Sequence, residues 1–160
     1  MNDESTSATS MPKLVRIGWL FLLLAFAMQG MVGVSVAFLI DTPLWDWHQS
    51  RTALALWDEP HFDPQTEAFR SWAMALVGGT IVSWSVAMFW IVLIPMGNRE
   101  PWAWWAIITS TLGWFFIDTT ISAIHGVGIN VLFNLMALTM IAVPLAMTWS
   151  WRGDENSKTR

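Results

Sequence analysis

Four long apolar blocks constrain the fold of this chain more than any other feature of its sequence. The first covers residues 17–40 without a charged side chain, and the others cover about 69–96, 101–124 and 127–149. Each block exceeds the roughly 20 residues that a helix needs to cross a bilayer. Backbone polar groups in hydrocarbon must be satisfied within the segment, which favours helices. We therefore predict an all-α integral membrane four-helix bundle, with residues 1–160 forming a single membrane domain.

The composition excludes several classes of protein. Hydrophobic residues make up 54% of the chain and charged residues only 12%, against about a quarter charged in an average soluble protein. There is no cysteine, so disulfides, thiolate metal sites and thiol catalysis are excluded. The net charge of -4 and the lack of a basic cluster argue against nucleic acid as a partner. Thirteen tryptophans suit the headgroup layer of a membrane.

The distribution of lysine and arginine predicts the orientation, because these residues concentrate on the cytoplasmic side. We expect both termini to be cytoplasmic, with residues 1–16 as a leader and 150–160 as a tail. Residues 41–68 then form one longer extracytoplasmic loop, and the outer side carries only Arg51 and Arg70. The inner side carries Lys13, Arg16, Arg99, Arg152, Lys158 and Arg160. The expected location is the cell membrane, as a multi-pass protein of a bacterial inner membrane.

A signal peptide is the competing interpretation of the first block. Ala25-Phe26-Ala27 resembles a small-residue cleavage site. The apolar run continues well past Ala27, however, whereas the apolar region of a signal peptide usually has about 7–15 residues. A membrane-spanning helix is therefore the favoured interpretation.

The outer loop is acidic and rich in tryptophan and proline. Arg51 to Trp57 could form a short helix at the surface, with Trp45, Trp47 and Trp57 dipping into the interface. The loop also holds Asp46 near His48, and the pair His61 and Asp63. That spacing is not diagnostic of a metal site, and a solvated loop is favoured. We predict no metal, no haem and no other cofactor.

The third block contains an ionisable residue, Asp118, in a segment where a charge is costly and often functional. Positions three, four and seven apart share one face of a helix. A single stripe is therefore formed by Thr111, Trp114, Asp118, Ser122 and His125. Asp118 and His125 lie about 10 Å apart along the helix axis, which is too far for a direct hydrogen bond.

Level-matching across the short turn at 126–127 predicts the partners of this stripe. Asn134 lies level with Asp118, and Asn130 lies level with Ser122. An asparagine amide can donate to a carboxylate. Gly33 of the first block and Gly78-Gly79-Thr80 of the second reach a similar depth. Small residues permit close helix approach, and they could equally leave room for a ligand beside Gly79.

Two interpretations of this polar layer remain open. In the first, the polar layer is a structural clasp that fixes the pairing of two helices. Membrane hydrogen bonds of this kind contribute about 0.6–2 kcal/mol. A binding site is the other, with ligand-binding candidates Trp114, Asp118, Ser122, His125, Asn130, Asn134 and Gly79. The inner half of the bundle offers no second ionisable residue, which argues against a proton path or channel.

We therefore expect a non-enzymatic membrane protein that binds a lipid-like or small amphipathic ligand, or a membrane-protein partner, at the layer around Asp118. The alternative is a membrane enzyme or transporter that uses Asp118 with His125. No catalytic residue is assigned, because the motifs of hydrolases and P-loop enzymes are absent. The expected partners include the lipid bilayer itself, and homo-oligomer formation is left open.

The run from Pro95 to Pro144 has a recognisable order of features. It contains Trp102-Ala103-Trp104-Trp105, then Trp114-Phe115-Phe116-Ile117-Asp118-Thr119, then Asn130 and Asn134. Over about a third of the chain, this order resembles small uncharacterised four-helix bacterial inner-membrane proteins. The resemblance implies the fold and the location and carries no activity. The four-span layout is also similar, as a fold alone, to sterol-isomerase-like four-helix proteins, whose acid and histidine pattern is not matched here.

Overall fold

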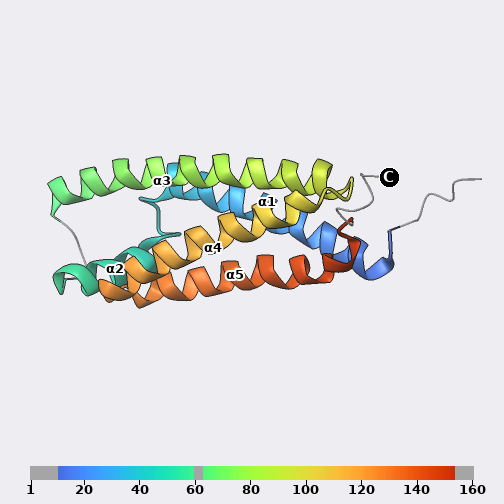
Figure 1. Ribbon diagram of the computed structural model, residues 1–160. Helices are drawn as coiled ribbons and strands as arrows, with labels where there is room; N and C mark the ends of the chain where they lie inside the picture. The colour runs from blue at the N-terminus through green and yellow to red at the C-terminus, as the bar shows by residue number, and fades with distance from the viewer. Residues whose placement is uncertain (1–10, 60–62, 154–160) are drawn as a thin grey trace, which may run out of the picture.

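The protein is an elongated bundle of helices in the computed structural model, which describes residues 11–59 and 63–153 (Figure 1). No β-strand occurs in these two ranges. The α-helices are α1 (Lys13–Leu39), α2 (Asp46–Trp57), α3 (Pro64–Ile91), α4 (Pro101–Ile124) and α5 (Gly128–Met147). A π-helical turn, η1 (Val92–Met96), extends α3, and a short 3-10 helix, η2 (Trp149–Trp151), follows α5. The predicted all-α class is thus confirmed.

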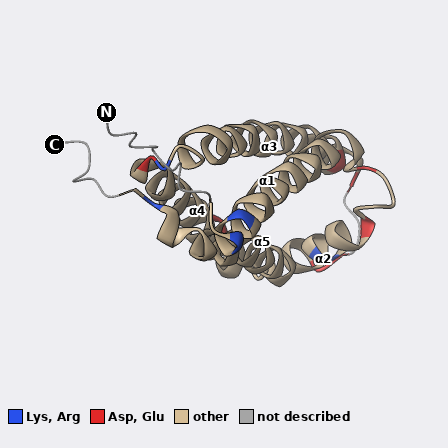
Figure 2. Ribbon diagram, turned by 90° about the vertical axis from the view of Figure 1, so that its right-hand side faces the viewer, with Lys and Arg blue, Asp and Glu red and all other residues tan. Residues whose placement is uncertain are grey.

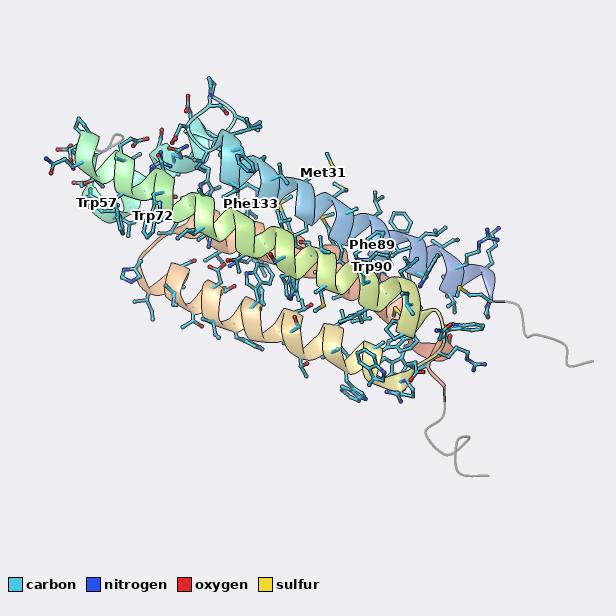
Figure 3. The ribbon with its side chains drawn as sticks, turned by 90° about the horizontal axis from the view of Figure 1, so that it is seen from above. Met31, Trp57, Trp72, Phe89, Trp90 and Phe133 are labelled. Carbon is cyan, nitrogen blue, oxygen red and sulfur yellow. The ribbon has the colours of Figure 1, made fainter. Side chains whose placement is uncertain are left out.

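Four of the helices are long and apolar enough to cross a membrane: α1, α3 continued through η1, α4 and α5. Their outward surfaces are apolar as well. Phe38 is 80% exposed and Met31 is 72% exposed, and Figure 3 shows Met31 pointing away from the bundle. A protein in water rarely exposes apolar surface this extensively. These features are those of a multi-pass helical membrane protein.

The helices associate mainly through α1, which packs most extensively along α3 and next along α5. α4 packs against α5, whereas α3 and α4 touch at few positions. In Figure 1, the four long helices run roughly side by side, and α2 lies at the end of the bundle beside α5.

The α1–α3 pair depends on a very close backbone approach. A β-carbon added to Gly78 would lie 2.5 Å from the backbone nitrogen of Ala37 and 2.6 Å from the carbonyl oxygen of Gly33. A β-carbon on Gly33 would lie 2.9 Å from the carbonyl oxygen of Gly78. Only glycine fits at these two positions, as expected where small residues bring membrane helices together.

Large side chains fill the half of the bundle nearer the termini. Its core contains Val15, Leu22, Phe26, Met88, Val92, Met96, Ala103, Trp104, Ile107, Ile141, Leu145 and Trp151. Trp104 is fully buried and donates its indole N–H to Thr148 Oγ1 at 3.0 Å. Trp19 donates to the carbonyl oxygen of Val92 at 2.8 Å, within the π-helical turn that contains Pro95. This half is therefore tightly packed, and neighbouring helices accept the indole N–H groups of Trp19 and Trp104. The buried indole nitrogen of Trp151 has no hydrogen-bond partner within the described residues.

The second predicted span begins earlier than the apolar block suggested. α3 starts at Pro64, not at about residue 69, because Asp63 caps its first turn. The Asp63 carboxylate accepts from the backbone N–H groups of Gln65 and Thr66 at 3.0 and 3.1 Å. The hydrogen bond from the Thr66 hydroxyl, together with these backbone bonds, lowers the pKa of Asp63. Proline then suits the first helical position, where no intrahelical N–H is needed.

α2 is longer than the predicted segment Arg51 to Trp57, since it begins at Asp46. Its first turn packs on α5. The rings of Trp47 and His48 both lie 5.6 Å from the ring of Phe133, measured between centroids. This contact explains the longer helix, because tertiary packing stabilises a turn that its polar sequence did not predict. Figure 3 shows Trp57 and Trp72 at this same end of the molecule.

Candidate functional site

The site is built on the hairpin of α4 and α5, which a very short turn connects. Gly126 adopts a left-handed conformation with φ of 71°, a region that glycine enters without steric cost. The N–H of Val127 then donates to the carbonyl oxygen of Ser122 at 2.9 Å. This turn reverses the chain within three residues and sets the last turns of α4 directly against the first turns of α5.

Asp118, Ser122 and Asn130 form one hydrogen-bonded cluster across this hairpin. The Asn130 amide donates to Asp118 Oδ1 at 2.8 Å and to Ser122 Oγ at 2.7 Å. The Ser122 hydroxyl donates to the same Asp118 oxygen at 3.2 Å. Ser122 is buried, whereas Asp118 and Asn130 are half-buried. The structure thus brings together three of the candidate residues that the sequence singled out.

Asn134 has a different partner from the one predicted. It is buried, and its amide donates to Thr119 Oγ1 at 3.1 Å rather than to Asp118. The sequence predicted correctly which backbone positions of α4 and α5 lie opposite each other. The midpoint in sequence of both bonded pairs, Ser122–Asn130 and Thr119–Asn134, falls near residue 126, at the turn. The Asp118 carboxylate extends one turn further out, because it accepts from Ser122 at position i+4. Helix level alone does not fix that side-chain direction.

One oxygen of Asp118 remains available to other groups. Both hydrogen bonds to this carboxyl group end on Oδ1. Within the part of the chain that the structure describes, Oδ2 has no hydrogen bond and Asp118 has no ion pair. Asn130 and Ser122 hold the side chain in place. The cluster therefore presents a fixed oxygen acceptor in a helix that has no other charged side chain.

An aromatic layer lies one turn further toward the termini. The rings of Trp114 and Trp84 are 6.3 Å apart, and Trp84 lies 5.7 Å from Phe26. The indole of Trp84 donates to Ser110 Oγ at 2.6 Å. Trp114 thus belongs to a contact among α1, α3 and α4. It separates the Asp118 cluster from the densely packed half of the bundle.

The polar stripe of α4 continues past this aromatic layer. Thr111 lies one turn beyond Trp114, and its side chain is only 4% exposed. Its hydroxyl oxygen has no hydrogen-bond partner within the described protein. A buried hydroxyl without a partner is uncommon and calls for an explanation such as a bound polar group. The stripe therefore contains a second polar atom that the protein leaves unsatisfied.

Two of the predicted site residues lie away from the cluster. His125 is exposed at the end of α4 and shares no hydrogen bond with Asp118 or Ser122. Gly79 is exposed on α3, and a β-carbon there would meet nothing within 4 Å. Its neighbour Gly78 makes the contact with α1 instead. The structure thus does not unite His125 or Gly79 with the Asp118 cluster.

The loop histidine and acids considered as metal ligands have other contacts. His48 lies among the rings of Trp45, Trp47 and Phe133, and burial lowers its pKa. Asp63 caps α3, and His61 lies outside the described residues. Within the described ranges, no group of three or more His, Asp and Glu side chains could hold a metal ion.

Sequence reasoning missed two partners in this region. Thr119 was not considered, although its pairing with Asn134 follows from the same level-matching that placed Ser122 opposite Asn130. The bond from Trp84 to Ser110 was also missed. Detecting it required the relative rotation of α3 and α4, on which hydropathy carries no information.

The fold and this cluster define a small multi-pass helical membrane protein with a polar site in one half of its bundle. Comparisons with protein-family models, with curated proteins and with solved structures gave no match to this chain.

Proposed function

We propose that this protein binds a small amphipathic molecule that carries a hydrogen-bond donor, and that Asp118 is the group that receives the donor. The observation that carries the proposal is the arrangement of the Asp118 carboxyl group. Ser122 and Asn130 both engage Oδ1, and Oδ2 has no partner among the described residues. The ligand would place an amine or hydroxyl on Oδ2 and its apolar body along the surrounding helices.

The hydrogen bonds around Asp118 support a binding role over a purely structural clasp. A clasp between α4 and α5 is already made by Asn130 with Ser122 and by Asn134 with Thr119. Neither of those bonds needs a carboxylate. An acid in a membrane-spanning helix is costly, and this one is only half-buried with one oxygen uncommitted. Its presence is better explained by a ligand than by helix pairing.

We further propose that the protein lies in a bacterial inner membrane, as the resemblance of its Pro95–Pro144 run implies, with both termini in the cytoplasm. The distribution of lysine and arginine supports this orientation. The Asp118 cluster then lies in the outer half of the bilayer, on the side of α2. The ligand would enter from the outer leaflet or from the space beyond it.

The test uses amphiphiles of equal chain length and different head groups. Dodecylamine, dodecanol and dodecanoate would be titrated into the protein in a mild maltoside detergent, with binding measured by calorimetry. We expect binding to weaken in that order, because the amine offers the most hydrogen-bond donors, the hydroxyl offers one and the carboxylate offers none. Asp118→Asn should weaken dodecylamine at least tenfold, which corresponds to about 1.4 kcal/mol.

Asn134→Leu is the matched control, because it breaks a hydrogen bond between α4 and α5 without touching Asp118. It should lower thermal stability and leave the head-group preference unchanged. A structural clasp predicts instead that both variants lose stability and that neither form distinguishes the three amphiphiles. Equal binding of dodecylamine to the wild type and to Asp118→Asn would overturn the proposal.

A further inference from the structure

An apolar groove lies on the outward surface between α1 and α5, separate from the Asp118 cluster. Its volume is about 720 Å³. α1 contributes Phe21, Leu24, Ala25 and Met28, and α5 contributes Leu135, Met136, Thr139, Met140, Val143, Pro144 and Met147. Thr139 is the single polar side chain in this lining, and it donates to the carbonyl oxygen of Leu135 at 2.8 Å. The groove therefore offers no unsatisfied polar group and suits an apolar occupant.

The groove arises from the way in which α1 and α5 cross. The two helices pack closely at Gly18. A β-carbon added there would lie 2.8 Å from Met147 Cβ and 2.8 Å from the carbonyl oxygen of Pro144. From that point they diverge, and the lining side chains occupy the walls of the wedge between them. Four of these side chains are methionines, which adapt readily to an irregular apolar surface.

The dimensions of the groove match one leaflet of a bilayer. Leu135 and Met147 mark its ends on α5, and twelve residues of helix span about 18 Å. The hydrocarbon core of a bilayer is about 30 Å thick, so one leaflet contributes roughly 15 Å. The groove begins near the end of the bundle where the chain termini lie and ends near its middle. It thus covers the depth of a single acyl chain from the leaflet on that side.

Basic residues precede the α1 wall of the groove. Lys13 is eleven residues before Leu24, so it lies within roughly 20° of Leu24 around the axis of α1 and about 70° from the mean direction of the four α1 residues that line the groove. It is exposed, at about 16 Å from Leu24 along that axis. Figure 2 shows basic segments at the end of the bundle where α1 begins. Arg99 and Arg152 at that end stack on tryptophan rings, whereas Lys13 has no such contact among the described residues.

We infer that this groove binds an acyl chain of an anionic phospholipid, with Lys13 pairing with the phosphate. A second copy of the protein is the less favoured occupant. Helix association in lipid relies on small residues that allow close backbone approach. Gly33 and Gly78 already use such a contact between α1 and α3, and the groove is lined mainly by long Leu, Met and Phe side chains. A flexible chain fits such a surface better than a rigid helix.

Native mass spectrometry in mild detergent tests this inference with equimolar phosphatidylglycerol and phosphatidylcholine. The wild type should retain one phosphatidylglycerol per chain in preference to phosphatidylcholine. Thr139→Trp and Val143→Trp fill the groove from exposed positions on α5, and each should reduce the retained lipid several-fold. Lys13→Gln should abolish the preference for phosphatidylglycerol and leave some lipid bound.

Two control variants separate the groove from nonspecific effects. Arg16→Gln removes a charge about 130° away from the mean direction of the α1 residues that line the groove. Leu132→Trp adds the same bulk outside the lining. Both should retain lipid as the wild type does. Asp118→Asn should also leave this lipid in place, so the result is independent of the proposed function. Retention of lipid by both groove-filling variants, or a dimer that they dissociate, would overturn the inference.

Discussion

Substitution of Gly78 with alanine tests the closest helix crossing in this structure. The added β-carbon would meet three backbone atoms of α1 at 2.5, 2.6 and 2.8 Å. Ordinary contact begins near 3.4 Å, so α1 and α3 would have to move apart by roughly 0.9 Å (3.4 minus 2.5). Backbone atoms cannot rotate away as a flexible side chain can. The whole crossing must therefore separate, and the contacts near Ala37 and Ile81 weaken together.

The expected magnitude follows from two opposing effects. Overpacking of a close contact costs about 1–3 kcal/mol. Alanine, however, is a better helix former than glycine by about 0.8–1.0 kcal/mol. Gly79 separates these effects, because it is the next residue of the same helix and its β-carbon would meet nothing within 4 Å. Gly78→Ala should therefore be about 1–3 kcal/mol less stable than Gly79→Ala.

The assay is reversible unfolding in mixed micelles of a maltoside and dodecyl sulfate, followed by helical circular dichroism. Gly78→Ala should unfold at a lower fraction of dodecyl sulfate than Gly79→Ala. Gly33→Ala should behave like Gly78→Ala, since it meets the same crossing from the other side. The double variant should lose less than the sum of the two, because helices already separated by one methyl group accommodate the second. Equal midpoints for Gly78→Ala and Gly79→Ala would refute the reasoning.

Two further predictions concern opposite ends of the bundle. Burial lowers the pKa of His48 below its ordinary value of 6.5, so the unfolded chain binds the proton more readily than the native state. The contribution of neutral His48 to the free energy of unfolding is therefore fully present above about pH 6.5 and is lost as the pH falls through the lowered pKa. Thermal unfolding measured as a function of pH should show this loss, and His48→Phe should remove the pH dependence. At the other end, Thr148→Val should cost about 1–3 kcal/mol because it leaves the buried indole N–H of Trp104 without an acceptor. Thr109→Val, at an exposed position bonded only within its own helix, should change the unfolding midpoint much less, and equal effects would contradict the role assigned to the Trp104 bond.

Hydropathy and helix period predicted the parts of the structure that depend on a single helix. The four apolar blocks became α1, α3, α4 and α5, and the stripe on α4 placed Asp118 and Ser122 on one face. The short turn at Gly126 made α5 the neighbour of α4. These features follow from local sequence, because a helix in hydrocarbon must satisfy its own backbone.

Features that depend on rotation between helices were not predictable in this way. Gly78 and Gly79 are adjacent and chemically identical, yet one meets α1 and the other meets nothing. The difference is a rotation of about 100° around α3, and only the neighbouring helix decides which glycine is used. The same limit applies to Asn134, whose partner depends on where the Asp118 side chain extends, and to α2, which is extended by its packing on Phe133.

The two halves of the bundle hold together by different means, and this bears on why Asp118 lies where it does. Near the termini, large apolar side chains from α1, η1, α4 and α5 fill a common core. Beyond the layer of Trp84 and Trp114, α1 and α3 meet at the Gly33–Gly78 crossing, and hydrogen bonds from Asn130 and Asn134 join α5 to α4. Rings of α2 also pack on Phe133 of α5. None of these contacts joins α3 to α4, which touch at few positions. Regions with fewer shared apolar contacts open at lower free energy than a packed core. Separation of α3 from α4 at this end would therefore disrupt few interactions, and the Asp118 oxygen lies on α4 in this half of the molecule.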